Sequence, residues 1–117
     1  MNLYQRAYQQ NSVATASPKT IILRLHERAL FDLQTAREAW KNGSLAEMRT
    51  HIEYIQNTLA YLAGCADPNY EITLILVRLY NYYIGQLSKA FLEPSEELFA
   101  ELEGHLTEWR ETWAKAE

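Results

Sequence analysis

Apolar residues recur every three to four positions along most of this chain, and no segment alternates between apolar and polar residues as a half-buried strand would. The clearest run follows Pro18 and continues to about residue 40. The few prolines and glycines fall near the ends of the periodic runs, where helices start and stop. This spacing predicts an all-α chain. The stripe of the first run is Ile22, Leu25, Ala29, Leu33, Ala36 and Trp40.

Short motifs predict where the helices begin and end. Ser17-Pro18 is typical of an N-cap followed by proline at the first helical position, and Asp67-Pro68 repeats this pattern. Asn42-Gly43 predicts the end of a helix. Ser44 and Glu47 match a capping box, in which each side chain accepts a hydrogen bond from a free backbone N–H at the start of the next helix.

Together these signals predict an antiparallel, up-and-down four-helix bundle with a short N-terminal helical or extended cap segment. A chain of 117 residues suffices for one domain with its own core. Short connections favour antiparallel neighbours. We expect the cap segment over residues 1–16 and the helices over about 17–42, 44–63, 67–92 and 94–116.

The third predicted helix carries more apolar surface than one buried stripe needs. Besides an inward stripe it has a second row that includes Leu74, Val77 and Ile84, with Ile75 and Tyr82 filling part of the remaining surface. A helix that is apolar nearly all round is normally buried on more than one side. Four explanations stay open: a wide core face, a cover formed by the N-terminal segment, a second subunit, or a surface kept for a partner.

Composition argues against several classes of function. The net charge of −4, with scattered Lys and Arg, disfavours nucleic-acid binding. No apolar run approaches the ~18 residues of a membrane span, and no secretory signal is visible. The single Cys65 fits a reducing cytoplasm. There is no glycine-rich phosphate loop and no base at a motif-like spacing from Cys65, so we expect neither an enzyme nor a bound cofactor.

The histidines show no metal-binding spacing. His26, His51 and His105 fall on three different predicted helices, and none is paired with another at one helical turn. We therefore expect no metal site and predict that all three are exposed or at an edge. A histidine phosphotransfer domain, which is also a four-helix bundle, is an alternative that would use His26 or His51.

Three segments resemble flagellar secretion chaperones of the FliS family. The opening Tyr8–Pro18 is similar to the family's N-terminal motif, and Leu79–Ile84 is similar to its Leu-Tyr-x-Tyr signature on the third helix. The run Glu101–Leu106, with Trp113 after it, resembles the last helix. The chain departs from the family at Leu25–Ala29, where Leu-Tyr-Asp-Gly-Ala is usual, and at Asp67–Tyr70, where the family usually has two glycines.

The resemblance implies a non-enzymatic cytoplasmic chaperone. Such a protein binds the disordered C-terminal segment of flagellin, prevents premature polymerisation and helps deliver the subunit to the flagellar type III export apparatus. Two points stay open: whether an export-gate component or a co-chaperone is a further partner, and whether the protein is a monomer or a homodimer. A self-associating helical adaptor is the alternative.

The resemblance also implies which residues bind the partner. Tyr4, Tyr8 and Val13 match the N-terminal segment that covers the site in the free chaperone. Asn57 matches a position where the family often has asparagine, although it also fits an exposed helix residue. Leu79, Tyr80 and Tyr83 match the third-helix signature, with core packing as the competing role. To these we add the surplus apolar residues Leu74, Val77 and Ile84.

Overall fold

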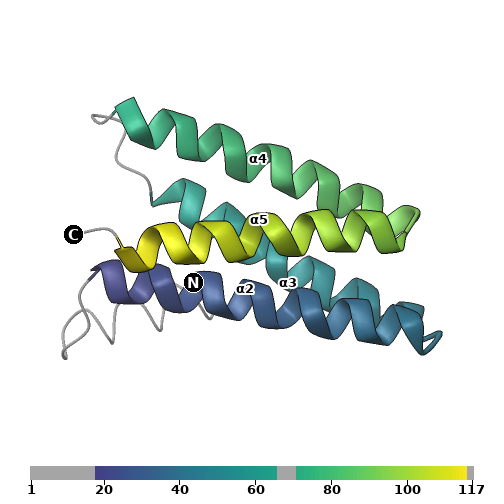
Figure 1. Ribbon diagram of the computed structural model, residues 1–117. Coiled ribbons are helices and arrows are strands. Elements are labelled where there is room, and N and C mark those ends of the chain that lie inside the picture. Colours follow the sequence, from purple (N-terminus) through teal and green to yellow (C-terminus); the bar gives the residue numbers. More distant parts are fainter. Residues whose placement is uncertain (1–17, 66–70, 116–117) are drawn as a thin grey trace.

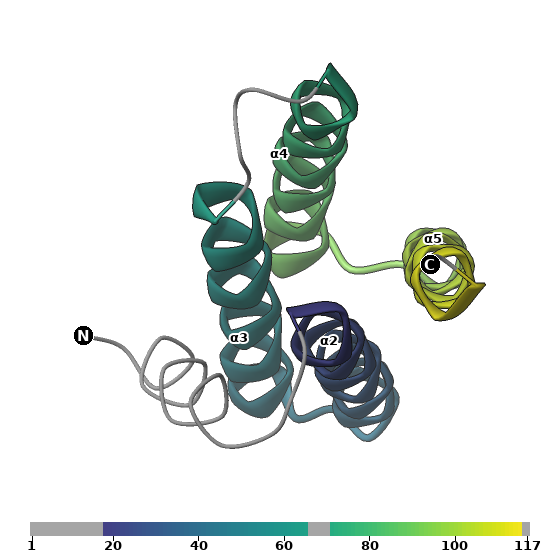
Figure 2. The same ribbon diagram turned by 90° about the vertical axis from the view of Figure 1, so that its left-hand side faces the viewer.

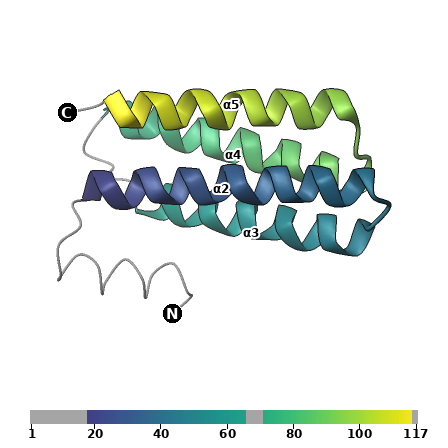
Figure 3. The ribbon, with the colours of Figure 1, turned by 60° about the horizontal axis from the view of Figure 1, so that its bottom comes forward.

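The computed structural model describes residues 18–65 and 71–115, and this part of the chain forms four helices (Figure 1). Successive helices run in opposite directions, and the α2–α3 and α4–α5 connections lie at the same end of the molecule (Figures 1 and 3). The predicted all-α helical bundle is confirmed. The helices are α2 (Pro18–Lys41), α3 (Leu45–Gly64), α4 (Glu71–Leu92) and α5 (Glu96–Lys115).

The helices do not close evenly around the core. Helix α3 packs against both α2 and α4, and α2 also packs against α5. Helices α4 and α5 form the least extensive contact of the neighbouring pairs, and Figure 2 shows α5 standing apart from α4 in the end-on view. The backbones of α4 and α5 are therefore the most widely spaced of the neighbouring pairs, and aromatic side chains such as Tyr83 and Trp109 meet between them.

One apolar core holds the four helices together. Leu33, Ile55, Leu87 and Leu106 come one from each helix, and each is fully buried. Burying one side chain of this kind contributes about 1.5–3 kcal/mol. The core continues along each helix at three- and four-residue spacing, as the sequence pattern predicts. Its other fully buried apolar members are Ala29, Ala36, Met48, Ile52, Leu59, Tyr83, Ala90 and Phe99.

The turn between α2 and α3 corrects the predicted capping box. Gly43 has φ +79, and the N–H of Ser44 donates to the carbonyl of Ala39 at 2.8 Å, which closes the end of α2. That N–H is therefore already used and cannot donate to Glu47. The Ser44 side chain makes no capping hydrogen bond either, so the capping-box prediction is wrong. Glu47 still places a carboxylate in the first turn of α3, where the helix dipole favours it.

Helix α5 has the side-chain cap that α3 lacks. The hydroxyl of Ser95 accepts a hydrogen bond from the N–H of Leu98 at 3.1 Å, and Glu96 and Glu97 place negative charge in the first turn. The α4–α5 connection thus ends in a defined helix start.

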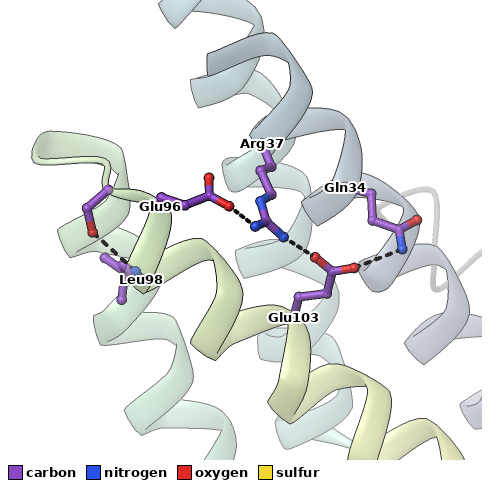
Figure 4. Close-up of polar contacts among 6 residues, drawn as sticks. Gln34, Arg37, Glu96, Leu98 and Glu103 are labelled. Carbon is purple, nitrogen blue, oxygen red and sulfur yellow. Dashed lines mark hydrogen bonds and ion pairs between the residues drawn. The ribbon is translucent and has the colours of Figure 1, made fainter. Parts of the chain in front are cut away.

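A polar clamp joins α5 to α2 (Figure 4). The guanidinium of Arg37 on α2 lies between two carboxylates of α5, with Glu103 at 2.6 Å and Glu96 on its other side. Gln34, one turn before Arg37, donates to the second oxygen of Glu103 at 3.2 Å. These contacts link α5 to α2 on the outside of the bundle.

Candidate functional site

Five large apolar side chains of α4 are exposed to solvent, and the four that lie from Leu74 to Tyr82 form what we call the α4 apolar face. Ile75, Leu79 and Tyr82 follow one another at helical spacing on one side of α4, and Leu74, which precedes Ile75, lies further round the helix. Their exposed fractions are 52% for Leu74, 49% for Ile75, 39% for Leu79 and 56% for Tyr82. Helix α4, which ends at Leu92, contributes five of the eight large exposed apolar residues found in the described part of the chain. A cluster of this kind marks a binding surface more often than scattered residues do.

The exposure of this face answers one question that the sequence leaves open. The core-facing side of α4 is occupied by Tyr80, Tyr83, Leu87 and Ala90, all of them buried. Leu74, Ile75, Leu79 and Tyr82 are exposed, so a wide core face does not account for all of the apolar surface of α4, although the half-buried Ile84 does pack against the core.

Tyr80 fastens α4 to the start of α2 through a buried histidine. Nδ1 of His26 lies 2.9 Å from the carbonyl of Ile22, so this nitrogen carries the proton and donates. Nε2 is therefore the acceptor, and the Tyr80 hydroxyl donates to it at 3.2 Å. Burial lowers the pKa of His26, against the smaller opposing effect of the Ile22 carbonyl. Burial also raises the pKa of Tyr80 to about 12, with a hydrogen bond from Trp113 opposing the shift. Both groups are neutral near pH 7.

Tyr83 makes the corresponding link between α4 and α5. Its hydroxyl donates to the carbonyl of Leu102 at 2.7 Å, and its ring lies 5.2 Å from that of Trp109. Burial raises the pKa of Tyr83 well above its ordinary value, and the negative charge of Glu103 adds to the rise. The two tyrosines therefore hold α4 from its inner side and leave the α4 apolar face unconstrained.

Polar contacts with α3 hold the other edge of α4. The Gln56 amide donates to the carbonyl of Ile84 at 3.2 Å and to the hydroxyl of Ser88 at 3.0 Å. Nearer the turn, Nε of Arg49 donates to the carbonyl of Phe91 at 3.2 Å, and the guanidinium lies over the Phe91 ring. Helix α4 is thus anchored along its α3 side.

The structure divides the residues expected to bind a partner into three groups. Leu74, Leu79 and Asn57 are exposed, and Val77 and Ile84 are half-buried. Tyr80 and Tyr83 lie in the core at 3% and 0% exposure, so their side chains position α4 and offer no surface to a partner. Tyr4, Tyr8 and Val13 lie outside the described residues, as do Ser17, Asp67 and Pro68 among the expected caps. Helix α2 begins at Pro18.

The prediction that all three histidines are exposed or at an edge is wrong for His26, which is fully buried. His26 lies one turn after Ile22 and one turn before Ala29, on the same apolar stripe. This spacing indicates a buried residue, and the prediction did not take it into account. His51 and His105 are half-buried. The burial of His26 also removes one of the two histidines considered for phosphotransfer.

A second buried polar group was missed. Asp32 on α2 is fully buried, and one of its carboxylate oxygens accepts a hydrogen bond from Nδ1 of His51 on α3 at 3.0 Å. Nε of the more exposed Arg28 lies 3.4 Å from the other oxygen. The second phosphotransfer candidate is therefore engaged in a contact between α2 and α3.

No cluster of three or more potential metal ligands occurs in residues 18–65 and 71–115. Nor is any helix in these ranges long and apolar enough to cross a membrane. The candidate site in these residues is therefore the α4 apolar face.

Comparison with known proteins agrees with this kind of site. The whole chain, residues 1–117, matches the family described as "Flagellar protein FliS". It is also similar to the flagellar secretion chaperone FliS of Bacillus subtilis (strain 168), with 30% identity over 110 residues that cover 94% of this chain and 83% of that protein. The chain therefore belongs to the FliS family, which is a family of flagellar chaperones and not of enzymes.

Proposed function

We propose that this protein is a cytoplasmic export chaperone that binds the C-terminal segment of flagellin on the α4 apolar face. Binding keeps flagellin from polymerising early and helps deliver it to the flagellar type III export apparatus. The observation that carries the proposal is the exposure of Leu74, Ile75, Leu79 and Tyr82 on one helix of a well-packed bundle.

The α4 apolar face would compete with other flagellin molecules for the apolar surface of the flagellin segment. An amphipathic segment that polymerises through its apolar face can bind another apolar surface of similar length instead, and this binding prevents its polymerisation. Ordering a flexible client costs about 2–5 kcal/mol or more of the gross contact energy. Because α4 is already held by α3, Tyr80 and Tyr83, the chaperone side of the surface needs little further ordering.

Calorimetric titration with the flagellin C-terminal segment of the same organism tests the proposal. The informative variant is Leu79→Ser with Tyr82→Ser, which removes one leucine and one aromatic ring from the α4 apolar face. Its matched control is Leu45→Ser with Phe31→Ser, which removes the same kinds of side chain from exposed positions on α3 and α2. Circular dichroism and thermal melting check that both variants fold.

We expect saturable 1:1 binding with a negative heat-capacity change for the unaltered protein. The α4 variant should bind at least about tenfold more weakly, because each apolar side chain buried on binding contributes of the order of 1 kcal/mol or more. The control should bind as the unaltered protein does. Absence of binding by the unaltered protein would remove flagellin as the client, and equal losses in both variants would place the surface elsewhere.

Self-association is the competing use of the same apolar face. A molar mass from light scattering that rises with concentration, and that returns to the monomer value in the Leu79→Ser, Tyr82→Ser variant, would favour it over client binding.

A further inference from the structure

Three residues of the α4 apolar face, Ile75, Leu79 and Tyr82, lie between two rows of charge of opposite sign, and Leu74 lies beyond the outer row. Tyr83 marks the side of α4 that faces α5, because its hydroxyl bonds Leu102 and its ring lies 6.3 Å from that of His105. Moving round α4 away from that side, helical spacing brings first Leu79, then Tyr82. Beyond them come the exposed cations Arg78 and Lys89.

The opposite row comes from α5. His105 faces Tyr83, and Glu101 and Glu108 lie one turn before and one turn after it on the same edge of α5. Both glutamates are exposed. The apolar strip therefore has carboxylates along its α5 side and cations along its outer side.

None of these four charged side chains is used to hold the bundle. Within residues 18–65 and 71–115, the ion pairs involve Arg28, Arg37, His51 and their partners Asp32, Glu96 and Glu103. Arg78, Lys89, Glu101 and Glu108 make none of them. Their charges remain available to a bound partner.

From this arrangement we infer that the surface recognises an amphipathic helix with bases along one edge of its apolar stripe and acids along the other. The bases of the bound helix lie against Glu101 and Glu108, and its acids lie against Arg78 and Lys89. The inference rests on the proposed function, since it takes the flagellin C-terminal segment as the occupant.

Charges of opposite sign on the two flanks also set the direction of the bound helix. Turning a helix end to end on a surface exchanges its left and right edges. An apolar strip alone accepts both directions, whereas the reversed direction here would put acids against the two glutamates and bases against the two cations. Like charges brought together in this way disfavour the wrong arrangement.

Charge reversal tests the inference. The variant Glu101→Lys with Glu108→Lys is compared with Glu38→Lys and Glu53→Lys, which make the same change in net charge at exposed positions on α2 and α3. Calorimetric titration with the flagellin C-terminal segment should show about a tenfold loss of affinity for the α5 variant relative to the control, because two rim pairs become repulsive. Raising the salt concentration should shrink this difference.

A second experiment exchanges the charges between the flagellin segment and α5. A flagellin segment in which the bases beside the apolar stripe are replaced by glutamate should bind the Glu101→Lys, Glu108→Lys variant better than it binds the unaltered protein. Equal binding by the α5 variant and its control, or failure of the exchanged segment to recover affinity, would overturn the inference. If Leu79→Ser with Tyr82→Ser still weakened binding in that case, the proposed function would stand; if it did not, both would fail.

Discussion

The hydroxyl of Tyr80 on α4 donates to Nε2 of His26 on α2, and both groups are buried. The acceptor nitrogen is available because Nδ1 of the same ring holds its proton against the carbonyl of Ile22. This one contact joins the start of the first described helix to the helix that carries the α4 apolar face. It also makes the fold depend on a neutral histidine.

Acid should destabilise this protein through His26. Burial lowers the pKa of His26 below its ordinary value of 6.5, so the unfolded chain takes up a proton at higher pH than the folded chain does. The corresponding part of the unfolding free energy is fully present above pH 6.5 and is lost as the pH falls through that value. Urea denaturation at a series of pH values should show a fall for the unaltered protein that is shallower in His26→Gln. Parallel pH profiles for the two proteins would contradict this assignment.

The two buried tyrosines should differ in what their hydroxyls contribute. Tyr80→Phe leaves Nε2 of His26 buried without a donor, and such an orphaned group costs about 1–3 kcal/mol. Tyr83→Phe removes a bond to the Leu102 carbonyl, which keeps its place in the helical hydrogen bonding of α5, so the loss should be about 0.5–1.5 kcal/mol. Chemical denaturation of both variants checks the order, and a larger loss for Tyr83→Phe would contradict it.

The two ion pairs of Arg37 should differ in their contribution to stability according to how exposed each carboxylate is. The side chain of Glu103 is 29% exposed and that of Glu96 is 52% exposed. Solvent screening weakens the more exposed pair, so Glu103→Gln should destabilise the protein more than Glu96→Gln, with both losses at or below about 1 kcal/mol. Thermal melting at low and high salt measures both, and Glu97→Gln on the same helix serves as the control. An effect of Glu96→Gln that exceeds that of Glu103→Gln would count against the geometry in Figure 4.

Alanine at two glycines should have opposite effects. Gly43 has φ +79 in the turn after α2, where a Cβ is strained, so Gly43→Ala should cost of the order of 1 kcal/mol. Gly104 lies inside α5 with nothing within 4 Å of an added Cβ, so Gly104→Ala should stabilise by about 0.5–1 kcal/mol. Melting temperatures decide between these outcomes, and a shift of the same sign in both variants would be inconsistent with the structure.

Sequence reasoning reached the helical bundle because periodicity and helix stops act locally. Gly43 ends α2 by its own conformational freedom, and the buried residues of α4 repeat at helical spacing. The capping box failed because the N–H of Ser44 bonds to Ala39 of the preceding helix, which the Ser44–Glu47 spacing does not reveal. The spacing of a four-residue motif cannot show that the backbone N–H of its first residue already donates to the preceding helix.

The sequence indicated which helix carries surplus apolar residues but not which of their side chains are exposed, for a similar reason. Surplus apolar residues on one helix pointed to α4, but which of them are exposed depends on how α3 and α5 pack against it. Tyr80 and Tyr83 belong to the same sequence signature as Leu79, yet they face the core while Leu79 is exposed. The buried pair of Asp32 and His51 joins two helices, and its partners could not be matched from the spacing within either helix.

Methyl NMR of the protein during titration with the flagellin C-terminal segment reports directly whether the α4 apolar face is the surface that binds flagellin. The methyl signals of Leu74, Ile75 and Leu79 should shift or broaden on binding, because these side chains pass from water into the interface. That of Leu45, which is exposed on α3, should stay in place. A shift of the Leu45 signal, with those of Leu74, Ile75 and Leu79 unmoved at saturation, would contradict binding on the α4 apolar face.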